Sequence, residues 1–230
     1  MLRYLLGLCL SIIFSSLYAQ SAISYGLQFA PGYSFRKSLP LNDTTIDDLI
    51  ELDEFESGEF AYSAGVRVEM KLGDKVGFQT GANFVRLGYR TGRTRVVSQI
   101  EGTETVLERE QQFAFSNIEV PFILNFYQEI SPQSRVYFKM GGSALYNLNR
   151  NARTLQYTEE ALTGDQTQPI TNGADVNVSV QTGAGYEHRL NKIALFVEPV
   201  FQYYLRSQHS DFNFARQPYF LGVTVGVKIK

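Results

Sequence analysis

Residues 176–187 read VNVSVQTGAGYE, and their side chains alternate between an apolar class and a small or polar class. Val176, Val178 and Val180 begin the apolar series, whereas Asn177 and Ser179 begin the other. A period of two predicts a β-strand with two unlike faces, because successive side chains of a strand point to opposite sides of the sheet. The segment is therefore read as a strand between an apolar and a polar environment.

The same alternation recurs along the chain and predicts eight strands. The predicted strands are residues 23–35, 60–72, 76–84, 117–126, 136–146, 176–187, 193–204 and 219–229. Short connections (73–75, 129–134 and 190–192) alternate with long ones (36–58, 91–112, 148–175 and 207–217). Short turns on one side and long loops on the other, with an even number of strands, are typical of an outer membrane barrel. No linker or second domain is visible.

Two local irregularities predict β-bulges. After residue 84 the alternation changes phase, and a bulge near Val85 would account for the change. Pro31, Pro121 and Pro199 lie within predicted strands. Proline cannot donate a ladder hydrogen bond, so each is predicted to mark a bulge.

The alternation alone does not say which face is outside, because a soluble lipocalin-like barrel would place its apolar face inward. The volume of the interior favours the opposite arrangement. Eight strands enclose a space only just wide enough for side chains, so small polar residues fit inside and the bulky aromatic residues of the apolar face do not. That face is also nearly free of charge, as contact with lipid requires. The sequence thus predicts an all-β, eight-stranded, antiparallel, up-and-down closed transmembrane β-barrel embedded in outer membrane lipid.

Aromatic residues gather near the strand ends, which predicts the interfacial girdles of a membrane barrel. Toward the long loops lie Tyr33, Phe35, Phe60, Tyr62, Phe113, Phe115, Tyr146, Tyr203 and Tyr219, and toward the short turns lie Tyr25, Phe78, Phe126 and Tyr186. The ordinary strand preference of aromatic residues accounts for part of this pattern.

Charged residues on the inward face form the candidate site. They are Arg67, Glu69, Lys71, Glu119, Lys139, Glu187, Glu198 and Lys228, four basic and four acidic. An unpaired charge in a narrow interior costs several kcal/mol, so a balanced set predicts a paired polar network that plugs the barrel. A transport or proton path is the alternative interpretation.

The N-terminal residues predict export from the cytoplasm. Arg3 precedes an apolar run over residues 5–14, and small residues lead to Ala19. This order is typical of a signal peptide at residues 1–19, followed by a barrel domain at residues 20–230. The net charge of −2 gives no broad basic surface for nucleic acid, and one cysteine with two histidines excludes a disulfide framework and cysteine-rich zinc sites.

The chain offers little catalytic chemistry. Asp47-Asp48 could face His209 and Asp211 as an acid pair resembling that of omptin proteases, but the spacing does not match a motif of that kind. The acidic residues of the first long loop lack the regular spacing of an EF-hand, so a solvated loop with a short helix around residues 46–50 is favoured over a calcium site. We therefore predict no catalytic residues, no cofactor and no metal.

Several stretches carry a resemblance to a known family. Residues 118–124 read IEVPFIL and resemble the "EIP"-type strand of the PorT-like outer membrane β-barrel family of Bacteroidota. Gly141-Gly142, the run from Gly183 to Glu187 and residues 222–228 are also similar, whereas Lys230 replaces the terminal aromatic residue common in proteobacterial barrels. The founding member takes part in type IX secretion, and the family has no catalytic residues to transfer.

These observations leave three hypotheses of function. The favoured one, which the resemblance supports, is a non-enzymatic envelope or type IX secretion accessory whose long loops contact a protein partner. A small-solute channel and an outer membrane hydrolase at the barrel rim are the alternatives.

Overall fold

The computed structural model describes residues 23–40, 56–100, 103–158, 161–171, 173–206, 209–210 and 214–229. The predicted signal peptide and the short helix predicted around residues 46–50 lie outside these ranges. Across the described residues, no helix has the length and apolar character needed to cross a membrane.

Within the described residues the chain forms eleven β-strands, and every pairing between them is antiparallel. They are β1 (Ile23–Pro40), β2 (Glu56–Lys71), β3 (Val76–Thr91), β4 (Thr94–Ile100), β5 (Thr103–Ser131), β6 (Ser134–Thr158), β7 (Ala161–Pro169), β8 (Val176–Leu190), β9 (Ile193–Tyr204), β10 (His209–Ser210) and β11 (Phe214–Ile229).

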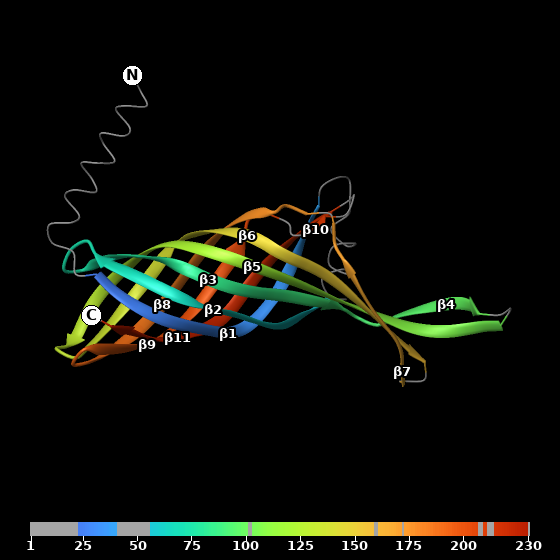
Figure 1. Ribbon diagram of the computed structural model, residues 1–230, viewed down its shortest axis with the longest axis horizontal. Coiled ribbons are helices and arrows are strands. Elements are labelled where there is room, and N and C mark those ends of the chain that lie inside the picture. The colour runs from blue at the N-terminus through green and yellow to red at the C-terminus, as the bar shows by residue number, and fades with distance from the viewer. Residues whose placement is uncertain are drawn as a thin grey trace, which may run out of the picture.

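Eight of these strands close into a cylinder (Figure 1). Neighbours run in the order β1, β2, β3, β5, β6, β8, β9 and β11, and β11 pairs with β1 to complete the circle. The predicted eight-stranded antiparallel barrel is therefore confirmed. Closure matters physically, because a closed barrel leaves no unpaired backbone edge within the lipid.

The short connections lie together at one end of the cylinder. Asn191 and Lys192 alone join β8 to β9, and Asn191 has a positive φ of 35°, which such tight hairpin turns favour. The chain ends of the barrel meet at the same end, since Tyr25 pairs with Ile229. Long connections leave the opposite end, as the sequence predicts.

The two faces of the wall also follow the sequence pattern. Along β9, exposed and buried residues alternate from Ile193 to Gln202. Bulky apolar residues such as Leu27, Phe122 and Val225 are exposed on the outside, whereas Glu187 and Glu198 are buried inside. The apolar face therefore forms the outer surface of the barrel.

The bulge predicted near Val85 is wrong. Strand β3 keeps its phase, and Val85, Leu87 and Tyr89 all point inward and are buried. The apolar residues appear out of phase in the sequence because the interior itself becomes apolar toward the long loops. The register shift in this region lies between β2 and β3, at Gly58 and Tyr62.

The bulges predicted at the three strand prolines are also wrong. Pro31, Pro121 and Pro199 all pair in unshifted register, as Pro31 does with Tyr62 and Pro199 with Val223. Each proline-containing strand also pairs with a second neighbour. In that pairing a few residue pairs are missing near the proline, and the pairing then resumes in the same register. A missing N–H removes one hydrogen bond on one side, which the neighbouring pairs tolerate.

The volume argument is correct about the outer face but wrong in excluding aromatic rings from the interior. Among the described residues eight buried rings point inward, those of Tyr89, Phe113, Phe115, Tyr127, Tyr137, Phe196, Tyr204 and Phe220. Phe113 is buried with Phe115, so neither belongs to the predicted girdle. Glycine makes the room, since a Cβ atom on Gly226 would collide with the ring of Phe196.

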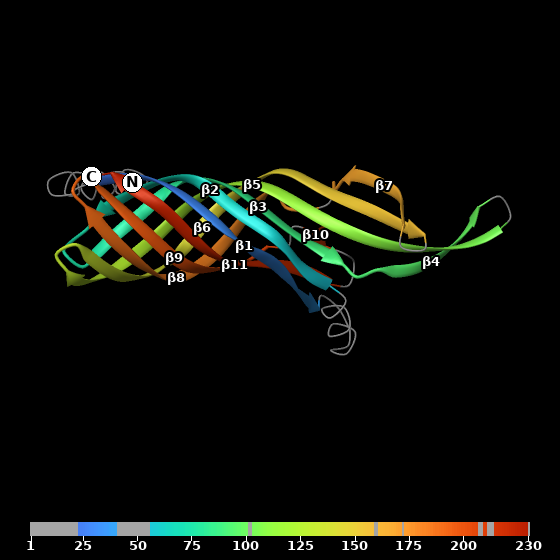
Figure 2. The same ribbon diagram turned by 90° about the horizontal axis from the view of Figure 1, so that it is seen from below.

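Two predicted loops are in fact strands that extend beyond the barrel (Figures 1 and 2). Residues 91–112 contain β4 and the first part of β5, and residues 148–175 contain the last part of β6 and all of β7. β5 has 29 residues and β6 has 25. At about 3.4 Å per residue, β5 runs for about 100 Å, far more than an apolar band of about 25 Å requires. We call β4, β7 and the adjoining ends of β5 and β6 the extension.

Candidate functional site

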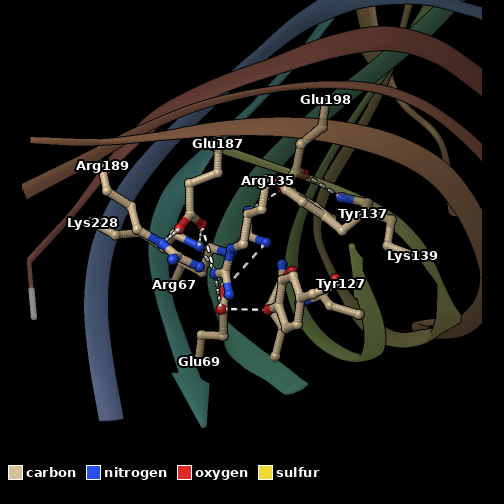
Figure 3. A network of polar contacts seen from close by, with 12 residues as sticks. Arg67, Glu69, Tyr127, Arg135, Tyr137, Lys139, Glu187, Arg189, Glu198 and Lys228 are labelled. Atoms are coloured by element: carbon tan, nitrogen blue, oxygen red, sulfur yellow. Dashed lines mark hydrogen bonds and ion pairs between the residues drawn. The ribbon is translucent and has the colours of Figure 1, made fainter. Parts of the chain in front are cut away.

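A network of buried charges lies inside the barrel (Figure 3). Glu198 on β9 is its first centre. Arg67 Nη1 on β2 lies 2.5 Å from Glu198 Oε1, and Lys139 Nζ on β6 lies 2.6 Å from Oε2. The hydroxyl of Tyr137 also donates to Oε1. Strands β2 and β6 thus direct three donor groups to one carboxylate on β9 that is closed to solvent.

Glu69 and Glu187 form the second centre. Lys228 Nζ on β11 lies 2.8 Å from Glu69 Oε2 and also pairs with Glu187. Arg135 Nη2 on β6 bridges the same carboxylates, at 3.1 Å from Glu69 Oε1 and 2.8 Å from Glu187 Oε2. Tyr127 donates its hydroxyl to Glu69, and Arg67 Nη2 lies 3.6 Å from Glu69 Oε2 and links the two centres.

Aromatic rings complete the surroundings of the buried cations. The guanidinium carbon of Arg135 lies 3.6 Å from the centre of the Tyr127 ring, and that of Arg67 lies 4.5 Å from the centre of the Phe196 ring. Ring faces attract cations, so they replace part of the lost hydration. These rings occupy the space that the glycines leave open.

Glu119 lies apart from this network, nearer the middle of the barrel. Its carboxylate accepts hydrogen bonds from Asn83 Nδ2 at 3.2 Å and from Gln202 Nε2 at 2.5 Å. Glu119 and Lys139 both line a central cavity of about 30 Å³. The amides, rather than a direct ion pair, hold this carboxylate.

The structure places seven of the eight predicted site residues in buried positions, and Lys71 differs. Lys71 is exposed at the end of β2, beside the opening at the short-turn end. Arg135 is buried instead, so the network keeps four buried cations, and three of the four predicted carboxylates pair with them. Arg135, Tyr127 and Tyr137 are absent from the predicted set. The alternation already places them on the inward face, because each lies an even number of residues from Asn125 or Lys139 on the same strand.

An apolar cluster fills the interior on the long-loop side of the central cavity. It consists of Ala30, Ala61, Val85, Leu87, Tyr89, Phe113, Phe115, Leu145, Val200, Tyr204 and Phe220. A cavity of about 30 Å³ has room for roughly one water molecule. The interior is therefore packed by ion pairs at one end and by hydrocarbon at the other.

The extension continues the barrel wall on one side as a polar sheet. β4 pairs with β5, and β7 pairs with β6. Arg153 donates to Asp165 from Nε at 2.9 Å and from Nη2 at 2.6 Å, and these hydrogen bonds lower the pKa of Asp165. Arg93 Nη1 lies 3.7 Å from Glu108 Oε2, and its guanidinium carbon lies 4.2 Å from the centre of the Tyr157 ring.

The residues weighed for catalysis do not come together in the described structure. His188 Nδ1 lies 3.0 Å from Ser134 Oγ beside the short turns. The side chain of His209, together with Asp47, Asp48 and Asp211, lies outside what the structure describes. Among the residues it does describe, no group of three or more His, Cys, Asp or Glu side chains is placed to hold a metal ion.

Comparisons with known proteins give one family match and several similar solved structures. Residues 18–209 match the outer membrane protein beta-barrel domain. Among solved structures, the chain is similar to Neisserial surface protein A, at 10% identity over 92% of this chain and 99% of that chain, with a TM-score of 0.40. It is also similar to the outer membrane protease OmpT from Escherichia coli, at 9% identity over 91% and 95% of the two chains, with a TM-score of 0.37.

A third similar structure is Ail, the attachment invasion locus protein of Yersinia pestis, at 8% identity over 89% of this chain and 98% of that chain, with a TM-score of 0.28. No curated protein matches the chain. The family match covers most of the sequence and agrees with the closed barrel and its apolar outer face. The chain therefore belongs to the outer membrane protein beta-barrel domain family, and its barrel lies in the lipid of the outer membrane.

Proposed function

We propose that the protein is a non-enzymatic outer membrane barrel that acts through its extension, which contacts a protein partner outside the lipid. The observation that carries this proposal is the contrast between a packed interior and strands that run far past the membrane. The resemblance to the PorT-like family of Bacteroidota favours a partner in the cell envelope and a role as a type IX secretion accessory. A signal peptide at residues 1–19 would direct export.

The packed interior speaks against the alternative of a small-solute channel. Buried ion pairs that must separate before a solute can pass are costly to break, because each separated charge would remain in a space of low polarity. The extension, in contrast, stands where a partner can reach it. Short turns of outer membrane barrels face the periplasm, so the extension stands on the extracellular side.

Site-specific photo-crosslinking in growing cells tests the proposal. A photoreactive amino acid is placed at Val97 or Leu162 on the extension, which are 62% and 54% exposed, and at Leu124 on the lipid-facing wall as a matched control, which is 40% exposed. We expect protein adducts of discrete mass from the two extension positions and none from residue 124. Absence of adducts from both extension positions, with the barrel folded, would overturn the proposal.

A further inference from the structure

The extension ends in two strands that each pair on one side only. In the part of the chain that the structure describes, β4 pairs with β5 alone and β7 pairs with β6 alone. Each strand thus presents a second edge of backbone N–H and C=O groups. Such an edge is a template for another strand, and proteins usually protect it.

The β7 edge carries more of the usual protection than the β4 edge does. β7 contains Gly164, Asp165 and Pro169, and its register shifts against β6 between Gln156 and Tyr157. Glycine, charge, proline and register shifts all discourage the addition of a strand. β4 reads TRVVSQI, has neither glycine nor proline, and pairs with β5 in unbroken register from Thr94 to Ile100.

The charges beside the β4 edge indicate what would bind there. Arg95 is the only charged residue in β4, and its side chain is 82% exposed. Its Nε lies 3.8 Å from Glu108 Oε1 of β5, so most of the guanidinium remains open to a further carboxylate. A segment with an acidic residue and β-branched neighbours would match this edge in both charge and strand preference.

We propose that the free edge of β4 binds an extended, acidic segment of a partner polypeptide, which adds to the sheet as one more strand. This inference rests on the proposed function and names the part of the extension that recognises the partner. Backbone hydrogen bonds to the edge would supply affinity, and the side chains at Val97 and Arg95 would supply selectivity.

The membrane argues against a second copy as the occupant. β4 runs along the long axis of the molecule (Figure 1), and two copies in one bilayer share that direction. A two-fold axis along the membrane normal relates such copies, so their β4 strands would run parallel with opposite faces of the sheet on the same side. That arrangement does not continue an antiparallel ladder. The occupant is therefore a segment of a different polypeptide.

The test uses the full barrel in lipid nanodiscs and a labelled peptide with the sequence of residues 103–109, TETVLER, which already pairs with β4 on its inner side. Fluorescence anisotropy measures binding, and hydrogen exchange locates it. We expect saturable binding that slows exchange of the β4 amides and leaves those of residues 103–109 unchanged. Val97→Asp should weaken binding by about tenfold or more, because a charge on the edge strand opposes strand addition and an aspartate also repels an acidic segment.

Thr163→Asp in β7 is the matched control and should change binding by less than about twofold. If Val97→Asp disturbs the hairpin, the exchange pattern of the unchanged protein still decides the question. No slowing at β4, or equal weakening by both aspartates, would overturn the inference. Self-crosslinking of the protein through residue 97 would also overturn it in favour of a second copy. Adducts with another protein at residue 97 without peptide binding at β4 would reject the edge and leave the proposed function standing.

Discussion

Glu198 holds a guanidinium and an ammonium in a space closed to water. Removing its carboxylate by Glu198→Ala leaves Arg67 and Lys139 buried without this partner. We expect the free energy of unfolding to fall by about 3–5 kcal/mol, the usual cost of breaking a buried ion pair. Urea unfolding in lipid vesicles, followed by the mobility of the folded band on unheated gels, measures the change.

The control for this variant is Glu129→Ala. Glu129 Oε1 lies 2.6 Å from Arg189 Nη2, but the pair is at the exposed rim and should contribute no more than about 1 kcal/mol. Equal losses for the two variants would contradict the structural role assigned to the buried network.

Gly226 makes a separate prediction at the scale of one side chain. A Cβ at this position would collide with the carbonyl oxygen of Leu27 and the ring of Phe196. Because the carbonyl belongs to the wall and cannot move away, Gly226→Val should destabilise the barrel by about 1–3 kcal/mol. The same unfolding assay checks this value, and Gly73→Val, in an open turn, should have little effect. A barrel unaffected by Gly226→Val would contradict the close approach of the Leu27 carbonyl and the Phe196 ring to this position.

The alternation of inward-facing and outward-facing side chains along each strand predicts most of the buried network from the sequence alone. It assigns Glu187 and Glu198 inward, and it would have assigned Arg135 in the same way if the predicted strand had begun one residue earlier. The exposure of Lys71 could not be predicted. The alternation shows which face of the barrel wall a residue occupies, but not where along the barrel axis the interior opens to water. The alternation also points Tyr127 and Tyr137 inward, but the room for such rings could not be predicted, since it depends on which glycine lies across the barrel.

At the scale of the elements, the extension is stabilised by ion pairs between side chains on neighbouring strands. Asp165 has its pKa lowered from the ordinary value of 3.8 by the hydrogen bonds from Arg153. The stabilisation is therefore fully present above pH 3.8 and is lost as the pH falls through the lower pKa of the folded hairpin. We expect the carboxyl carbon of Asp165 to titrate by NMR with a midpoint below 3.8, and Arg153→Gln to raise that midpoint. A midpoint that does not respond to Arg153→Gln would contradict the pairing.

The strands of the extension are the elements that the sequence pattern does not predict. In the barrel, lipid on one side and packed groups on the other impose the alternation that reveals each strand. Beyond the membrane both faces of β5 and β6 meet mainly polar surroundings, and residues 103–112 read TETVLEREQQ without a period of two. These residues therefore resemble loops in the sequence although their backbone is paired.

At the scale of the whole molecule, the packed interior predicts a barrel that does not conduct ions. The ion network and the apolar cluster leave a central cavity of about 30 Å³ between them. Purified protein in a planar lipid bilayer should insert without steady current, whereas a wide porin measured in parallel should conduct. Sustained openings of uniform size would instead favour the small-solute channel and would remove the argument from packing.

The contact between β1 and β11 has a consequence for how the polypeptide can be rearranged. Tyr25 and Ile229 face each other like the last pair of any neighbouring hairpin, and only the connecting peptide is missing. A few linking residues would supply it, and new termini could then open between Asn191 and Lys192. Such a circular permutant should assemble into the same cylinder, because the wall of the barrel has no natural first strand.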